Sequence, residues 1–241
     1  MALASLVIER LFHHLFFEFF LRIQKEKNIE SLRNQRAKKN VTNLFKGTMY
    51  TISVSVGWVI LSQVDYSPKF VKWIPYGRDD GSLDNLFLNY PIKDYPESVK
   101  YYYLVTLGYH VSKGIQDFFI NERRNDFAEM MLHHFLTYLL YFGSYILNIL
   151  PAGSLVIFYL DSTDVPVSFA KAFGETTYKN TTGFFGVCMW VSWILNRLVF
   201  FPTVYHHAFY LTPSKIPGLS DPSRHNEKFV MNWLLGLCSF L

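Results

Sequence analysis

Two histidines and two aspartates stand inside long apolar stretches of the sequence: His133, His134, Asp161 and Asp164. An ionisable side chain at membrane depth is costly, so such residues usually mark a functional site. A neutral histidine can accept a proton from an amine or attack an activated acyl group. A carboxylate can hold the imidazole in one tautomer and stabilise the imidazolium ion. These four residues are therefore candidates for a buried acid–base or nucleophilic centre.

The spacing of these residues favours a shared site. Asp161 and Asp164 are three residues apart and share a helix face, and Glu129 precedes His133 by four residues on another helix. The histidines stand about 12 Å below the inner surface, since each helical residue advances about 1.5 Å. The next apolar stretch runs back in the opposite direction, which predicts that Asp164 lies at a similar depth.

Two other roles use the same residue types. Imidazole and carboxylate are ordinary metal ligands, but adjacent helical residues such as His133 and His134 point about 100° apart and cannot easily share one ion. The sequence therefore predicts no metal site. The second role, in which paired polar groups hold a helical bundle together, stays open beside catalysis.

The elements that must position these residues are long apolar helices. Half of the residues are hydrophobic and 17% are charged, against about 25% charged in a typical soluble domain. The apolar residues gather in blocks of about twenty, the length that crosses a bilayer core. This pattern predicts an all-α membrane protein of six to seven transmembrane helices, over residues 3–22, 44–63, 101–120, 127–149, 152–172 and 183–205, with a last one starting near 229.

The first and last apolar blocks are unusual. The first carries Glu9, Arg10, His13, His14 and Glu18, and a cleavable signal peptide has no charges in its apolar region. We expect a span with its polar face against the bundle, and an amphipathic helix in the membrane interface is the alternative. The last block, residues 229–241, is shorter than a span, so we expect an incomplete helix or further chain there.

Charge alternates between the predicted loops. The segment 22–46 holds eight Lys and Arg residues, and Arg123 and Arg124 lie in a later short loop. The positive-inside rule places these two loops on the cytosolic side and the loop 64–100 outside. Lys113 and Asp117 are interpreted as a pair along one helix, and Pro166 predicts a kink near the aspartates.

The polar motifs occur in a characteristic order. Residues 124–129 read Arg-Asn-Asp-Phe-Ala-Glu, followed by His133-His134, by residues 161–164 (Asp-Ser-Thr-Asp) and by residues 197–199 (Arg-Leu-Val) with Pro202. This order resembles the Lag motif and the neighbouring segments of the ceramide synthases in the TLC family. The resemblance extends from about residue 30 to the end of the sequence.

The resemblance implies a TLC-type helical bundle around a cavity. It implies an N-terminal hydrophobic helix and basic loop over residues 1–43 and a TLC-like domain over residues 44–241. The expected reaction transfers an acyl group from acyl-CoA, a co-substrate rather than a cofactor, to the amine of a sphingoid base. His133 and His134 would supply the nucleophile or base, Asp161 and Asp164 would orient and charge-balance them, and Glu129 and Arg124 would support the site.

The resemblance also implies where the protein works and with what. We expect an integral protein of the endoplasmic reticulum membrane, with the mitochondrial inner membrane as the alternative. Membrane lipids are the expected partners, together with a second copy of the chain or a larger membrane complex, and no nucleic acid.

Two residues depart from the family's pattern. Leu160 stands where the family has histidine before the first aspartate, and Ser168 stands where it has an acid. Both favour an alternative function, in which a catalytically inactive TLC protein binds lipid or serves as a structural subunit of a membrane complex.

Overall fold

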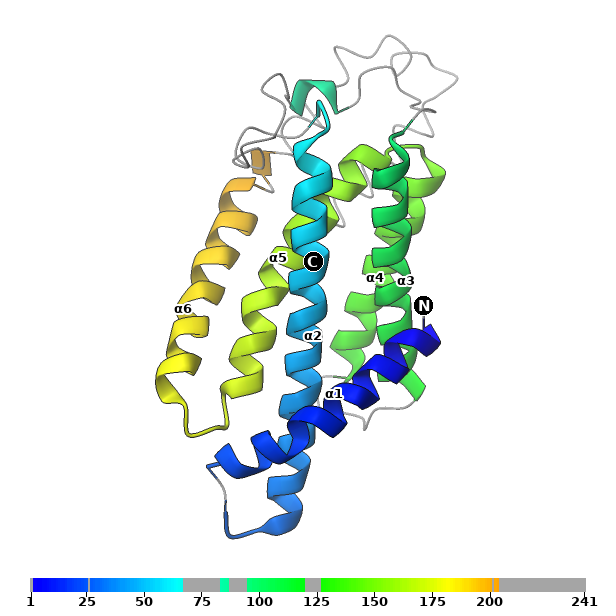
Figure 1. Cartoon of the computed structure of the whole chain (residues 1–241). Helices are drawn as coiled ribbons and strands as arrows, with labels where there is room; N and C mark the ends of the chain where they lie inside the picture. Colours follow the sequence, from blue (N-terminus) through cyan, green and yellow to red (C-terminus); the bar gives the residue numbers. More distant parts are fainter. Residues whose placement is uncertain are drawn as a thin grey trace. The chain divides into compact units, whose positions relative to one another are not determined.

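The computed structural model describes residues 2–25, 27–66, 83–86, 95–119, 127–200 and 202–203. Within these ranges every named element is helical (Figure 1), and the only strand-like pairing is an isolated bridge between Gln24 and Thr176. The all-α prediction is confirmed. The elements are α1 (Ala2–Ile23), α2 (Glu30–Ser62), the short η1 (Leu83–Asn85), α3 (Glu97–Phe119), α4 (Phe127–Ile146), α5 (Leu150–Phe173), α6 (Lys179–Ile194) and the π-helix η2 (Leu195–Phe200).

Helix α2 begins much earlier than the apolar pattern indicated. The expected loop over residues 22–46 is helical from Glu30 onward, so that prediction was wrong for most of its length. The reason is that Arg, Lys, Gln and Glu are good helix formers. A helix can therefore continue well beyond its apolar part, and the expected boundary between residues 43 and 44 falls inside α2.

Two of the described helices are long and apolar enough to cross a membrane by themselves. These are Glu30–Ser62 and the combined stretch Lys179–Phe200. The expected total of six to seven spans stays a prediction. The block near residue 229 lies outside the described residues.

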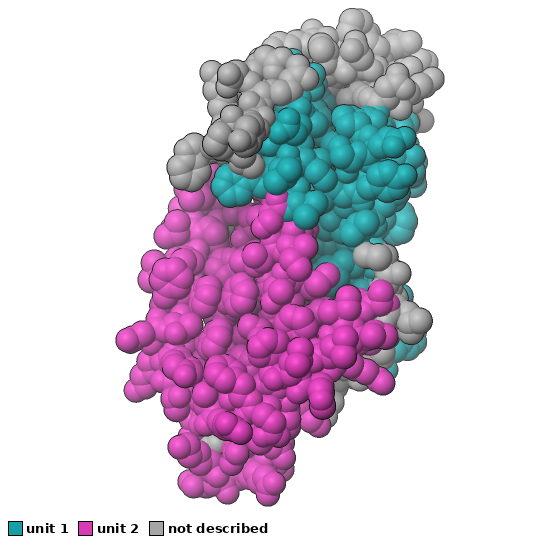
Figure 2. Space-filling model, in the orientation of Figure 1, with its two compact units in different colours: residues 1–2, 56–157, 201–241 teal, residues 3–55, 158–200 magenta. Residues whose placement is uncertain are grey.

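The chain divides into two compact units (Figure 2). Unit 1 contains residues 1–2, 56–157 and 201–241, and unit 2 contains residues 3–55 and 158–200. Helices α2 and α5 each contribute residues to both.

The core of unit 1 is built on α3 and α4. Tyr103 is fully buried, and its hydroxyl donates to the carbonyl of Tyr141 at 2.7 Å and is also hydrogen-bonded to the hydroxyl of Ser144. Gly153 lies against these side chains, and a Cβ atom there would stand 2.7 Å from Ser144 Oγ. A glycine is therefore required for this close approach of α5 to α4.

A left-handed residue ends α4. Asn148 has a φ of 54°, a conformation that asparagine tolerates better than most residues. The Asn148 N–H donates to the carbonyl of Tyr145 at 3.2 Å, and the Ile149 N–H donates to that of Ser144 at 3.0 Å. This is the hydrogen-bond pattern of a Schellman motif, which satisfies the last carbonyls of a helix. Helix α5 starts directly afterwards, with Pro151 in its first turn.

In unit 2, α1 crosses the N-terminal half of α2 obliquely and packs against it (Figure 1). The fully buried residues of this contact are Phe20, Ala37, Val41 and Ala172. Aromatic rings extend it, with ring centroids 5.3 Å apart for Phe12 and Phe45 and 5.7 Å apart for Phe20 and Phe173. Helix α1 is thus anchored by one face to both α2 and α5.

Two turns of unit 2 are joined by hydrogen bonds. The Thr177 N–H donates to the carbonyl of Ile23 at 2.9 Å, and the Lys25 N–H donates to that of Glu175 at 3.2 Å. Arg36 and Glu175 add an ion pair at 2.9 Å. The α1–α2 turn and the α5–α6 turn therefore lie at the same end of the unit, in agreement with the alternation of loops expected from the charge pattern.

Candidate functional site

A histidine and an aspartate form a partly buried pair in unit 1. His134 of α4 places Nε2 3.2 Å from Oδ2 of Asp117 on α3, and the two side chains are 14% and 11% exposed. When Nε2 carries the proton, it donates to the carboxylate, and Nδ1 keeps its lone pair to accept another proton. The pair therefore has the composition of an oriented acid–base group.

Antiparallel packing of α3 and α4 positions this pair. Gly114 lies one turn before Asp117, and Tyr138 lies one turn after His134. A Cβ atom on Gly114 would overlap the hydroxyl of Tyr138, which donates to the carbonyl of His110 at 3.1 Å. The rings of His134 and Tyr138 are nearly parallel, with centroids 6.1 Å apart. Glycine thus makes room for the tyrosine that packs beside the histidine.

Sequence reasoning missed Asp117 as the partner of His134. It had considered Asp117 only as a pair with Lys113 along the same helix, and that pair stays a prediction. In the structure, Lys113 Nζ donates to Gln116 Oε1 at 2.8 Å. The sequence does contain an indication of this pair. Asp117 lies in an apolar block, and that block directly precedes the block that carries the histidines.

The two aspartates of the sequence motif lie on α5 in unit 2. Asp161 is 1% exposed and accepts a hydrogen bond from the Ser53 hydroxyl of α2 at 2.7 Å. Asp164 is half-buried one turn further along. The buried carboxylate thus has a hydroxyl donor, as expected for a polar group removed from water.

A side-chain amide contacts the residues between these aspartates. Asn196 lies in the π-helix η2 and is 8% exposed, and its Nδ2 stands 3.2 Å from Ser162 Oγ and 3.0 Å from Thr163 Oγ1. Short π-helical segments often occur at functional sites. Sequence reasoning did not connect Ser53 or Asn196 with the aspartate motif.

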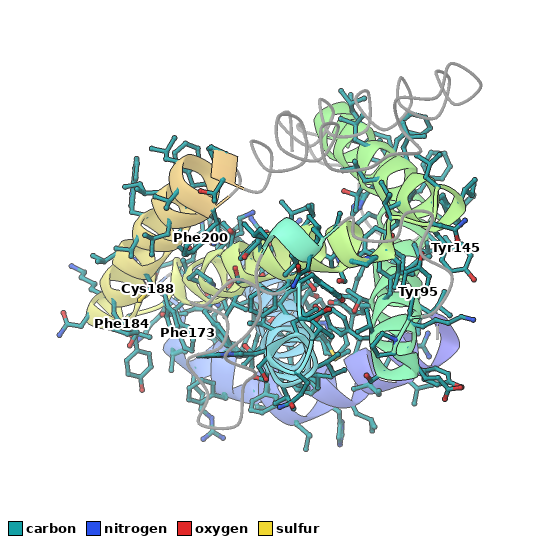
Figure 3. The ribbon with its side chains drawn as sticks, turned by 90° about the horizontal axis from the view of Figure 1, so that it is seen from above. Tyr95, Tyr145, Phe173, Phe184, Cys188 and Phe200 are labelled. Atoms are coloured by element: carbon teal, nitrogen blue, oxygen red, sulfur yellow. The ribbon has the colours of Figure 1, made fainter. Side chains whose placement is uncertain are left out.

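Aromatic side chains continue from this contact along α6 and η2. Phe200 packs against Tyr159 with ring centroids 5.5 Å apart. In Figure 3, Phe184 and Cys188 lie one turn apart on α6, and Phe200 lies further along. Cys188 is a free, half-buried thiol, and Cys238 lies outside the described residues.

The predicted site residues fall into both units. His133 and His134 belong to unit 1, and Asp161 and Asp164 belong to unit 2. That the four come together stays a prediction. Glu129 and His133 contribute backbone to α4, but their side chains and the whole of Arg124 lie outside the described part of the chain.

Three further expectations concern metal binding and the departures from the family motif. Among the residues that the structure describes, no three His, Cys, Asp or Glu side chains form a group that could hold a metal ion. Leu160 is half-buried and Ser168 is 7% exposed, so neither departure is a surface change. Helix α5 continues through Pro166, and a kink there stays a prediction.

The described residues form long helices, and two of these are long and apolar enough to cross a membrane. Residues 40–241 match the TLC domain. The chain therefore belongs to the TLC domain family, as its Lag-like motif predicted.

Curated relatives are ceramide synthases by name. The chain is 26% identical to ceramide synthase hyl-1 of Caenorhabditis elegans over 70% of this chain and 42% of the relative. It is 30% identical to ceramide synthase LOH2 of Arabidopsis thaliana over 53% of this chain and 42% of the relative. It is 32% identical to human ceramide synthase 4 over 47% of this chain and 29% of the relative. The matched part spans less than half the length of each of these relatives.

Proposed function

We propose that this protein is an acyl-CoA-dependent N-acyltransferase that acts on a sphingoid base, in the manner of the ceramide synthases. The single observation that carries the proposal is the His134–Asp117 pair, with 3.2 Å between Nε2 and Oδ2. It gives a histidine of the Lag-like motif a carboxylate partner in a partly buried place. The similarity to proteins named ceramide synthases supplies the substrate class.

The chemistry requires a proton acceptor. The amine nitrogen attacks the thioester carbon, the new C–N bond forms, the C–S bond breaks, and the amine gives up a proton while the thiolate of CoA takes one up. His134 accepts the amine proton through Nδ1 and returns it to the leaving thiolate, and Asp117 balances the imidazolium charge in between. An alternative order, in which a motif histidine first takes the acyl group, uses the same pair to activate the nucleophile.

Asp161 and Asp164 are proposed as further carboxylates of the reaction, a role that comes from their match to the family's motif. Ser53 fixes the carboxylate of Asp161, and Asn196 contacts the intervening Ser162 and Thr163. Preorganised polar groups of this kind lower the cost of placing charge in a site that excludes water.

The membrane arrangement is proposed along with the activity. Helices α2 to α6 cross the endoplasmic reticulum membrane, and with a further span beginning near residue 229 they form six spans around an acyl-chain cavity. The basic cytosolic segments meet the phosphates of CoA, for which Arg and Lys are suitable partners. We propose a second copy of the chain or a larger membrane complex as a partner, with the mitochondrial inner membrane as the alternative location.

A second function is favoured by the residues around Asp161. Leu160 replaces the family's histidine with a side chain that cannot transfer protons, and Asp161 already has a hydroxyl partner in Ser53. An inactive TLC protein would keep these polar groups only to hold its helices together. It would bind lipid or act as a structural subunit.

The deciding experiment is an acylation assay on purified protein in lipid nanodiscs. Sphinganine is offered with acyl-CoA of several chain lengths, and the N-acyl product is measured by mass spectrometry. His134→Ala should abolish the product, while His14→Ala, at an exposed histidine of α1, should leave it unchanged. No product from folded wild-type protein at any chain length, and none from Leu160→His, would favour the inactive alternative.

A further inference from the structure

The outer face of α1 carries two adjacent rows of different character. Residues four apart follow one another along a helix ridge. One ridge, here named the apolar row, consists of Val7, Leu11, Leu15 and Phe19, which are 52%, 56%, 69% and 44% exposed. The neighbouring ridge, here named the polar row, consists of Arg10, His14, Glu18 and Arg22, which are all exposed.

The opposite face of α1 is packed against the charged half of α2. His13 Nε2 lies 3.0 Å from Thr42 Oγ1, and Arg33 Nε donates to the carbonyl of Leu21 at 3.1 Å. With the Phe12–Phe45 ring contact, these place residues 12–21 of α1 against residues 33–45 of α2. That part of α2 contains Arg33, Arg36, Lys38 and Lys39, whereas its apolar part begins after Lys46. These contacts therefore lie on the charged half of α2 and not on the part that can cross a bilayer.

Neither bulk lipid nor bulk water suits both rows. In the hydrocarbon core the polar row would expose charged groups to acyl chains, which is costly. In water the apolar row would expose four large hydrophobic side chains in one continuous strip. A helix that lies in the membrane interface satisfies both rows, because its apolar side enters the acyl chains and its polar side stays among the headgroups.

Charge indicates which lipids the surface fits. Arg22, Lys25, Lys27, Lys38 and Lys39 are exposed on α1, on the α1–α2 turn and on the charged half of α2. Basic side chains next to a membrane attract anionic headgroups. The turn is also joined to the α5–α6 turn, so the cations lie at one end of unit 2.

We propose that α1 is a membrane-surface helix that binds an anionic phospholipid leaflet through its apolar row and the neighbouring cations. It lies in the plane of the cytosolic leaflet and does not cross the bilayer. The inference concerns residues of unit 2, whereas the His134–Asp117 pair belongs to unit 1, and it does not depend on the proposed acyl transfer.

The test is a depth measurement on the full chain in phosphatidylcholine vesicles containing about a fifth phosphatidylserine, a composition chosen for its negative surface charge. Single cysteines carry a nitroxide at Leu11, Leu15, Phe19, His14 or Glu18, in a background with Cys188→Ala and Cys238→Ala. Collisions with oxygen and with a water-soluble nickel chelate report depth. Val187→Cys, at a 64% exposed position of α6, is the reference for a lipid-facing span.

The proposal predicts a constant shallow depth of about 5–10 Å along the apolar row. It also predicts strong nickel contact along the polar row, and an apolar row that becomes shallower in vesicles without phosphatidylserine. A depth that increases steadily from Leu11 to Phe19, with values near that of Val187, would show a span and overturn the proposal. Low collision rates with both probes along the apolar row would show a protein contact instead and would equally overturn it.

Discussion

Replacing Asp117 by asparagine removes the charge from the His134–Asp117 pair while nearly preserving its shape. An amide oxygen can still accept from Nε2, but it cannot balance the imidazolium that forms when His134 takes a proton. Hydrogen bonds to charged groups contribute about 1.5–3 kcal/mol. If this contribution is made mainly in the transition state, its loss lowers kcat about 10- to 150-fold, because each 1.36 kcal/mol is a factor of ten.

The assay is steady-state acylation of sphinganine in nanodiscs, with kcat and KM determined separately for acyl-CoA. Asp117→Asn should lower kcat and leave KM nearly unchanged, because Asp117 acts on the reacting histidine rather than on CoA. Glu175→Gln is the matched control, since it makes the same chemical change in an ion pair whose side chains are 33% and 43% exposed. Loss of the charged hydrogen bond requires a decrease of kcat of at least about tenfold. If folded Asp117→Asn protein keeps kcat within about twofold of wild type, the catalytic role of the pair is refuted. A lower melting temperature with unchanged kcat would assign it a structural role.

The remaining predictions concern packing and buried polar groups. Gly114→Ala should lower the free energy of unfolding by about 1–3 kcal/mol, because its Cβ overlaps the hydroxyl of Tyr138. Gly183→Ala is the control, because a Cβ atom there meets nothing within 4 Å, and it should be neutral or slightly stabilising in thermal unfolding. In a double variant, Tyr138→Ala should relieve much of the loss of stability caused by Gly114→Ala. If the effects of Gly114→Ala and Tyr138→Ala were strictly additive in the double variant, that result would contradict the overlap. Ser53→Ala should lower the free energy of unfolding by about 1–3 kcal/mol, because it removes a donor to Asp161. Ser53→Thr keeps the hydroxyl and should have a melting temperature near that of wild type. Equal melting temperatures of the two variants would count against the Ser53–Asp161 hydrogen bond.

The helices could be predicted from the sequence because apolar blocks reveal where helices lie in a membrane protein. The residues at which the helices begin and end were harder to predict. Residues 30–46 are too charged to read as a span, yet they continue α2, because helix formation depends on backbone and side-chain propensity rather than on apolarity. The apolar blocks placed the turn after α4 at residues 150–151, whereas it lies at residues 147–149, where Asn148 adopts a left-handed conformation.

The candidate site could be predicted in its members but not in all its contacts. His134 and Asp161 stood out because an ionisable group in an apolar block is unusual. Their partners Asp117 and Ser53 were missed because these contacts join different helices, and the register between two helices is set by packing. The Gly114–Tyr138 contact, which positions His134 against α3, has no signature in either helix alone.

The division of α2 into a charged half and an apolar half has a consequence for the bilayer in which the protein resides. The apolar half, residues 47–62, is about 16 residues and roughly 24 Å long at about 1.5 Å per residue. This length is close to the hydrocarbon thickness of the endoplasmic reticulum, about 27 Å, and well short of that of the plasma membrane, about 32–33 Å. In the proposed arrangement α1 holds the charged half at the membrane surface, so the helix cannot slide inward to make up the difference. We therefore expect membrane thickness to retain this protein in thin bilayers, and lengthening the apolar half of α2 by one turn to weaken that retention.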